Sequence, residues 1–213
     1  MNKSKIKICG IKELETLNCC IENKINYFGL VFYKKSQRNI SYENAIKLIE
    51  YSRNKNISSV GVFVNEGLEN LCEIIKKLKI SFLQLHGDEN NDYIKFIKKK
   101  NNINIIKSIS INCFNDFKNI SKYKDNDFYL FDYKPVKGEL PGGNAKTFDW
   151  ELIKGVKIDK PWFISGGINI NNIKKIENFA IPYGIDISSG VEVRPGIKSN
   201  KKIKSLIEFY GPN

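Results

Sequence analysis

The feature that most limits how this chain can fold is a repeated order of short apolar runs and longer helical patterns. A run rich in β-branched and aromatic residues is followed by a turn and then by apolar residues at every third or fourth position, about eight times. Most runs are almost continuously apolar, as parallel strands covered on both faces are. We therefore predict an α/β fold with a closed parallel sheet, a (β/α)8 TIM barrel, and keep a doubly wound open sheet as the alternative. The predicted strands are 5–9, 27–32, 59–64, 81–86, 104–109, 128–132, 162–166 and 183–188.

The segments between these runs predict the helices. Helical spacing is clear in 43–55, 68–79 and 91–100 and weakest in 112–125. No Pro/Ser-rich linker, low-complexity tract or change of composition divides the chain. We therefore predict one catalytic domain over residues 1–213, near the short end of what a complete barrel needs.

The charge of the chain is strongly positive. Lysine and arginine outnumber aspartate and glutamate, 35 against 23, which gives a formal net charge of +12. A basic surface can bind nucleic acid, but these lysines are scattered over predicted helices and mingle with acidic residues, as on solvated faces. We therefore expect no nucleic-acid partner, although a positive field favours the capture of a small anion.

The cysteines and the N-terminal segment bear on the cellular setting. Cys9, Cys19, Cys20, Cys72 and Cys113 are odd in number and irregularly spaced, so we predict reduced thiols, no disulfide frame and no metal site. The segment MNKSKIKICGIKEL has neither the apolar region of a signal peptide nor a membrane span. We expect a cytoplasmic protein with no membrane partner.

In barrels of this kind the active site lies where the strands end, and chemically capable residues gather at those positions. Cys9 ends the first predicted strand, Asp132 the sixth, and Asp186 lies in the eighth, while Arg38 follows the second. A carboxylate at the end of an apolar strand is costly unless it is paired or functional, and partial desolvation favours the protonated form that a general acid needs. We interpret the other four cysteines as small buried apolar residues.

The loops after the seventh and eighth strands predict a phosphate site. Gly166 and Gly167 follow one strand, and Ser189 and Gly190 follow the other. Small residues let backbone N–H groups approach phosphate oxygens, and Arg194 and Lys198 lie close by in sequence. Either cluster alone would more often be a tight β–α turn. Their occurrence at neighbouring strand ends predicts a phosphorylated small-molecule substrate.

The sequence strings around these strand ends closely resemble one family, the phosphoribosylanthranilate isomerases of tryptophan biosynthesis. KICG, LQLHG and D-x-SSGVE with its trailing PG-x-K are specific signatures, whereas the glycine pairs alone are not. The resemblance covers nearly the whole chain. It runs through KICGI (7–11), GLVFYKKSQRNIS (29–41), VGVFVNE (60–66), LQLHGDE (83–89), LPGGNAKTFDW (140–150), FISGGININNI (163–173) and GIDISSGVEVRPGIKS (184–199).

The resemblance implies an Amadori rearrangement that converts an aminoaldose, N-(5-phosphoribosyl)anthranilate, into an aminoketose, 1-(2-carboxyphenylamino)-1-deoxyribulose 5-phosphate. It implies Cys9 as the base and Asp132 as the acid, with no cofactor. It also implies that Arg38 holds the anthranilate carboxylate and that Asp186 orients the ribose or the amine, unless Asp186 is a structural ion-pair partner. Gly142 and Gly143 belong to the substrate-binding loop of the family. We expect a monomer, with a dimer as the alternative.

The resemblance alone does not explain several positions near the predicted site. Cys9 must be partly thiolate to act as a base, and Lys7, two residues earlier on the same side of the strand, would favour that form. His86, the single histidine, is interpreted as a positioned structural residue that supports the site. Gln37 stands where the family commonly has proline, and Asn144-Ala145 replace a usual Thr-Gly. We expect the first change to loosen the Arg38 loop and the second to alter the loop after the sixth strand.

Other barrels that act on sugar phosphates are the nearest alternatives. Indoleglycerol-phosphate synthase would be expected to carry a lysine where the first strand ends, and the histidine-pathway aminoaldose isomerase an aspartate, whereas this chain has Cys9. A phosphate-binding barrel without catalysis is disfavoured by the presence of both Cys9 and Asp132. A nucleic-acid-binding protein is disfavoured by the absence of a recognisable binding motif.

Overall fold

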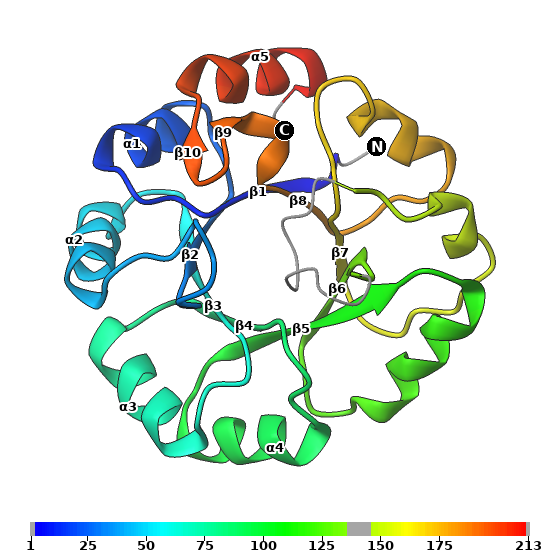
Figure 1. Cartoon of the computed structure of the whole chain (residues 1–213), viewed down its shortest axis with the longest axis horizontal. Helices are drawn as coiled ribbons and strands as arrows, with labels where there is room; N and C mark the ends of the chain where they lie inside the picture. Colours follow the sequence, from blue (N-terminus) through cyan, green and yellow to red (C-terminus); the bar gives the residue numbers. More distant parts are fainter. Residues whose placement is uncertain (1–2, 136–145, 212–213) are drawn as a thin grey trace.

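The computed structural model describes residues 3–135 and 146–211 and places eight parallel strands in a closed barrel. Each strand pairs with the next along the chain, and β8 pairs with β1 to close the ring, as Figure 1 shows in a view along the barrel. The prediction of a closed barrel rather than an open sheet is confirmed. The strands are β1 (Lys5–Cys9), β2 (Tyr27–Val31), β3 (Ser58–Phe63), β4 (Phe82–Leu85), β5 (Asn104–Ile111), β6 (Phe128–Tyr133), β7 (Trp162–Ile164) and β8 (Gly184–Ile187).

The outer layer of the barrel is uneven. Regular α-helices follow the first four strands and the last one, whereas 3-10 helices follow β5, β6 and β7 in the described residues. The predicted weak helix at 112–125 is one of these 3-10 segments. The α-helices are α1 (Leu14–Glu22), α2 (Tyr42–Ser52), α3 (Leu68–Leu78), α4 (Asn91–Lys100) and α5 (Asn200–Tyr210), and the 3-10 helices are η1 (Phe114–Lys122), η2 (Trp150–Ile153), η3 (Ile173–Asn178) and η4 (Ser189–Val191).

Side-chain caps fix where three of the α-helices begin. The side chains of Ser41, Asn90 and Ser199 accept hydrogen bonds from backbone N–H groups in the first turns of α2, α4 and α5. Each cap gives a partner to one of the donors that a helix start leaves unpaired. None of the described helices is long and apolar enough to cross a membrane.

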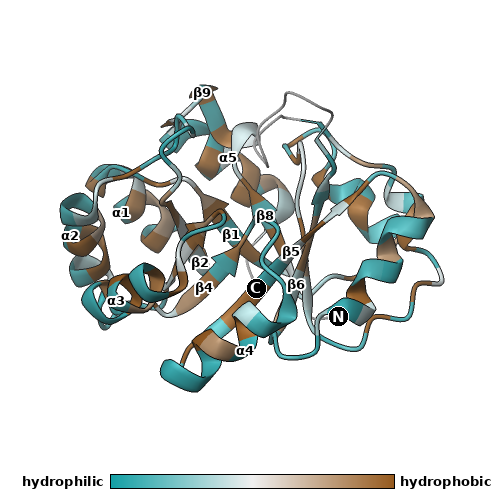
Figure 2. Cartoon of the chain, turned by 60° about the horizontal axis from the view of Figure 1, so that its bottom comes forward, coloured by the Kyte–Doolittle hydropathy of each residue, from teal (hydrophilic) through white to brown (hydrophobic). Residues whose placement is uncertain are grey.

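Alternation along the strands divides the apolar residues into two cores. On β1, Ile6 and Ile8 face the helices, while Lys7 and Cys9 face the barrel interior. The outer core between strands and helices is the larger one, and Figure 2 shows hydrophobic residues on the strands with hydrophilic residues outside. Every second residue of a strand therefore faces the interior, where chemistry can take place.

Aromatic rings fill the end of the barrel where the strands begin. Tyr27 packs edge-on against Phe82 and Phe163, and Phe128 contacts Phe163 and Tyr183. The hydroxyl groups of Tyr27 and Tyr183 lie 2.7 Å apart in a hydrogen bond. This filled end leaves the opposite end of the barrel, where the strands finish, as the place for a pocket.

A short antiparallel hairpin of β9 (Glu192–Arg194) and β10 (Ile197–Lys198) follows η4 and precedes α5. It brings Glu192 and Lys198 beside each other at the mouth of the barrel. The interpretation of the four remaining cysteines as buried holds for Cys19 and Cys20, whereas Cys72 is only partly buried. It is wrong for Cys113, which is exposed at the start of η1.

Candidate active site

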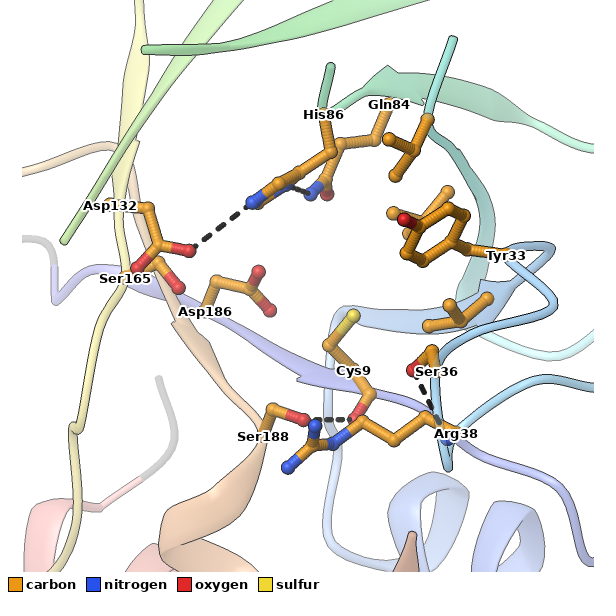
Figure 3. A pocket seen from close by; sticks show the side chains of 13 residues that line it. Cys9, Tyr33, Ser36, Arg38, Gln84, His86, Asp132, Ser165, Asp186 and Ser188 are labelled. Atoms are coloured by element: carbon orange, nitrogen blue, oxygen red, sulfur yellow. Dashed lines mark hydrogen bonds and ion pairs between the residues drawn. The ribbon is translucent and has the colours of Figure 1, made fainter. Parts of the chain in front are cut away.

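The pocket lies inside the barrel at the carboxyl ends of the strands, where Figure 3 shows its side chains converging. Cys9 approaches from one side and Asp132 from the other, with Asp186 between them. The structure thus brings together residues that are 123 positions apart in the sequence, Cys9 and Asp132. The lining residues are Cys9, Val31, Tyr33, Ser36, Arg38, Val62, Val64, Gln84, His86, Asp132, Ser165, Asp186 and Ser188.

Cys9 ends β1 with its side chain in the pocket and is 8% exposed. Its neighbour on β2 is Gly29, and a Cβ atom added there would lie 2.7 Å from the Sγ atom of Cys9. The carbonyl oxygen of Cys9 accepts a hydrogen bond from the Ser188 hydroxyl at 3.0 Å. Glycine on β2 therefore provides the space that the thiol occupies.

The protonation of Cys9 differs from the simple expectation that Lys7 favours the thiolate. Burial raises the pKa of the Cys9 thiol, and this effect outweighs the opposing charges of Lys7 and Lys198. Lys7 does share the interior side of β1, as predicted, but its Nζ atom lies 2.9 Å from Oδ2 of Asp186, whose charge raises the pKa of Cys9. Burial thus favours the thiol form of Cys9.

Asp132 comes from β6 and is 5% exposed. Its Oδ1 atom accepts a hydrogen bond from the backbone N–H of Tyr133 at 2.8 Å, and its Oδ2 atom lies 3.3 Å from Nε2 of His86. His86 in turn contacts the amide of Gln84 through Nδ1. A Cβ atom at Gly166, which has a φ of +93°, would lie 3.0 Å from Oδ1 of Asp132, so glycine again leaves space beside a site residue.

Asp186 has one engaged oxygen and one open oxygen. Its Oδ2 atom accepts a hydrogen bond from the fully buried ammonium group of Lys7. Its Oδ1 atom is buried and has no hydrogen-bond partner among the described residues, and Figure 3 shows the carboxylate turned toward the pocket. Burial alone would lower the pKa of Lys7, but Asp186 and Cys9 raise it. Lys7 therefore stays charged, and Asp186 still offers an acceptor oxygen without a partner among the described residues.

Arg38 lies beside Cys9 at the mouth of the pocket. Its Nε and Nη2 atoms donate to the two carboxylate oxygens of Glu192 at 2.9 and 2.8 Å, and Lys198 donates to the same carboxylate at 2.7 Å. Burial would raise the pKa of Glu192, but the hydrogen bond from Arg38 and the charge of Lys198 lower it. No hydrogen bond from Nη1 is present among the described residues, so this edge of the guanidinium is available to another planar anion.

The loops after β7 and β8 touch each other, as the sequence predicts for neighbouring strands. A Cβ atom at Gly190 would lie 2.0 Å from the carbonyl oxygen of Ile168. Gly166 and Gly167 both have positive φ, and no hydrogen bond from the N–H groups of Gly166, Gly167, Ser189 or Gly190 is present within the described part of the chain. Two adjacent loops thus carry backbone N–H groups that have no hydrogen-bond acceptor among the described residues.

Comparison with known proteins identifies the family. The family model of N-(5'-phosphoribosyl)anthranilate (PRA) isomerase matches residues 6–209. The chain is 42% identical over 204 residues to the N-(5'-phosphoribosyl)anthranilate isomerase of Thermoanaerobacter sp. (strain X514), covering 96% of both chains. This chain belongs to the phosphoribosylanthranilate isomerase family.

Solved structures agree in fold over the full length. The phosphoribosylanthranilate isomerase of Thermotoga maritima superposes with a TM-score of 0.87 at 32% identity, covering 97% of this chain and 98% of that one. A phosphoribosylanthranilate isomerase solved with reduced 1-(o-carboxyphenylamino)-1-deoxyribulose 5-phosphate gives a TM-score of 0.82 at 30% identity, with the same coverage.

Two departures from the common pattern of the isomerase family have different outcomes. The Gln37 carbonyl accepts a hydrogen bond from Lys12, and the backbone N–H of Arg38 donates to the Ser36 hydroxyl, so hydrogen bonds tie this loop in place of the missing proline. Close packing of Gly196 against the Gln37 carbonyl adds to the restraint. Gly142, Gly143, Asn144 and Ala145 lie outside the described residues.

Several pocket residues were given no role from the sequence. Gln84, Ser165 and Ser188 line the isomerase-family pocket, and Glu192 positions Arg38. Gln84 stands two positions before His86, so strand alternation already predicts that both side chains share a face. Within the parts of the chain that the structure describes, no group of three His, Cys, Asp or Glu side chains is arranged to hold a metal ion.

Proposed function

We propose that this protein is an N-(5-phosphoribosyl)anthranilate isomerase that works by general acid–base catalysis with Asp132 and Cys9. The observation that carries the proposal is the placement of a buried carboxyl group and a buried thiol on opposite sides of one pocket. Membership of the isomerase family supports the substrate. The product is the aminoketose 1-(2-carboxyphenylamino)-1-deoxyribulose 5-phosphate.

In the first step, protonated Asp132 transfers its proton to the ribose ring oxygen. The bond between carbon 1 and that oxygen breaks, and the nitrogen lone pair forms an iminium with carbon 1. Asp132 is left as a carboxylate, which accepts a hydrogen bond from the N–H group of Tyr133 and lies 3.3 Å from Nε2 of His86. The Tyr133 donor stabilises the charge that the step creates.

In the second step, Cys9 removes the proton from carbon 2 and the iminium accepts the electron pair to give an enolamine. The enolamine becomes the aminoketose when carbon 1 gains a proton and the carbon 2 hydroxyl loses one, so substrate and product have the same composition. Because burial raises the pKa of Cys9, the thiolate forms best once the iminium cation lies beside it. The positive charge formed in the first step thus promotes the removal of the proton in the second step.

The remaining contacts orient the substrate. The free Nη1 edge of Arg38 is suited to the anthranilate carboxylate, since a guanidinium fork matches a planar anion. The open Oδ1 atom of Asp186 is available to a ribose hydroxyl or to the amine. The N–H groups of Gly166, Gly167, Ser189 and Gly190 are available to the phosphate. Gly142 and Gly143 complete the proposed substrate-binding set.

The activity test generates phosphoribosylanthranilate in situ and follows the loss of its anthranilate fluorescence. We expect Cys9→Ser and Asp132→Asn each to lower kcat by several orders of magnitude, because each removes a proton-transfer group. Cys113→Ser, at an exposed thiol outside the pocket, should retain full activity. Folded wild-type protein with no activity above background would rule out the proposed function.

The phosphate site has a direct structural test. A crystal soaked in inorganic phosphate should show the anion between the N–H groups of the two loops. An anion bound only by surface lysines, with those N–H groups directed elsewhere, would contradict this assignment and the substrate orientation that follows from it.

A further inference from the structure

We propose that Gln84 is a positioning residue: its side-chain amide fixes the tautomer of His86, so that the imidazole ring donates a hydrogen bond to Asp132. The kinetic consequence rests on the proposed function, because it assumes that Asp132 is the acid. The tautomer itself follows from the contacts among the three side chains.

The contact between Gln84 and His86 decides where the ring carries its proton. Gln84 is 1% exposed on β4, and its Nε2 atom lies 2.9 Å from Nδ1 of His86. An amide nitrogen only donates, so Nδ1 must accept, and a neutral ring then has its single proton on Nε2. Gln84 therefore directs the N–H group of the ring away from itself.

That N–H group faces Asp132. The Nε2 atom of His86 lies 3.3 Å from Oδ2 of Asp132, and the other oxygen already accepts from the N–H of Tyr133 at 2.8 Å. When Asp132 gives up its proton, its carboxylate stays 5% exposed and depends on these two donors for stabilisation. With the opposite tautomer, a nitrogen lone pair would face the new negative charge. Gln84 thus strengthens Asp132 as an acid through the orientation of the His86 proton.

The other end of the same amide is unpaired. The Oε1 atom of Gln84 is buried and has no hydrogen-bond partner among the described residues. Unsatisfied buried acceptors are rare and costly, and they concentrate where function requires them. An amide turned by about 180° would place Oε1 against Nδ1 and would require the proton there. The two orientations therefore predict opposite tautomers, which can be measured.

The direct test uses the fact that His86 is the single histidine of the chain. Protein labelled with [15N]histidine would be studied by NMR at about pH 8, where an ordinary histidine with a pKa of about 6.5 is neutral. We expect the wild type to carry the proton on Nε2. Gln84→Met, similar in size but unable to donate, should give a mixture, and Gln84→Glu should move the proton to Nδ1. A wild-type proton on Nδ1, or no change of tautomer in either variant, would overturn the proposal.

The kinetic test shows whether Gln84 acts through His86. Gln84→Met should lower kcat about tenfold with little change in KM, because the change weakens the acid in the transition state. In a His86→Asn background the same substitution should cost almost nothing further. An equal loss in both backgrounds would show that Gln84 acts by another route, and Gln84→Glu provides a second variant of nearly unchanged shape if Gln84→Met does not fold. A protein without isomerase activity refutes the proposed function but leaves the NMR result to decide the tautomer.

Discussion

Replacing Gly29 by alanine should misplace the base without touching any group that donates or accepts a proton. The added Cβ atom would lie 2.7 Å from Sγ and 3.0 Å from Cα of Cys9, whereas carbon and sulfur atoms in contact ordinarily lie about 3.5 to 4 Å apart. Because the Cα atom of Cys9 is held in the paired strand β1, the thiol must move instead, by about 1 Å. A displacement of that size costs about a hundredfold in rate, or about 2.7 kcal/mol of activation free energy.

The fluorescence assay would measure kcat for Gly29→Ala, and urea denaturation would measure its free energy of unfolding. Overpacking should cost about 1 to 3 kcal/mol of stability. Gly61→Ala is the matched control, because its Cβ atom would meet the flexible end of Ile80 in the outer core, at 2.6 Å. We expect Gly61→Ala to lose stability but to retain kcat. If Gly29→Ala keeps wild-type kcat, or if both variants lose it equally, Gly29 does not set the position of the thiol.

Three further outcomes are expected. Arg38→Ala should weaken binding of a reduced product analogue by a few kcal/mol, about 2 to 3, measured by titration calorimetry, and unchanged affinity would place Arg38 outside the carboxylate site. Glu89→Gln should lower the free energy of unfolding in urea by about 3 to 5 kcal/mol, because the substitution leaves the fully buried Lys107 without its counter-charge. Glu151→Gln, in an exposed ion pair, should change the free energy of unfolding little. The rate of Cys9 alkylation by iodoacetamide should keep rising above a pH of about 8.5, the ordinary thiol pKa, because burial raises the pKa of Cys9 and only the thiolate reacts. A plateau of the rate below that pH would contradict this prediction.

The sequence predicted the barrel because each strand is a nearly continuous apolar run that must be covered on both faces. The bounds of β7 were predicted two residues too long, since 165–166 already form the turn in which Gly166 has a positive φ. The 3-10 character of η2 and η3 was not predicted. Their segments bury only a few apolar residues, and such short patterns do not distinguish a 3-10 turn from an α-helix.

The sequence predicted the site residues whose own side chains carry the chemistry. It did not predict the partners that position those side chains or set their protonation. Cys9 and Asp132 could be found at strand ends, and the structure places both in one pocket. Glu192 could not be assigned to Arg38, because the two are 154 positions apart and meet only through the hairpin that follows β8. The protonation of Cys9 likewise depends on burial and on Asp186, which no local pattern contains.

The uneven outer layer supports the two sides of the pocket differently. Cys9 ends β1 and Arg38 follows β2, which are backed by complete α-helices. Asp132 lies in β6 and Ser165 follows β7, and the described residues after these strands form 3-10 turns. A 3-10 turn has poorer hydrogen-bond geometry than an α-helix and contributes fewer buried contacts, so local opening there costs less free energy. Backbone amides behind β5 to β7 should therefore exchange with deuterium sooner than those of α1 to α4. We therefore expect the thiol to lie on the more rigid side of the barrel and the carboxyl group on the side that opens more readily.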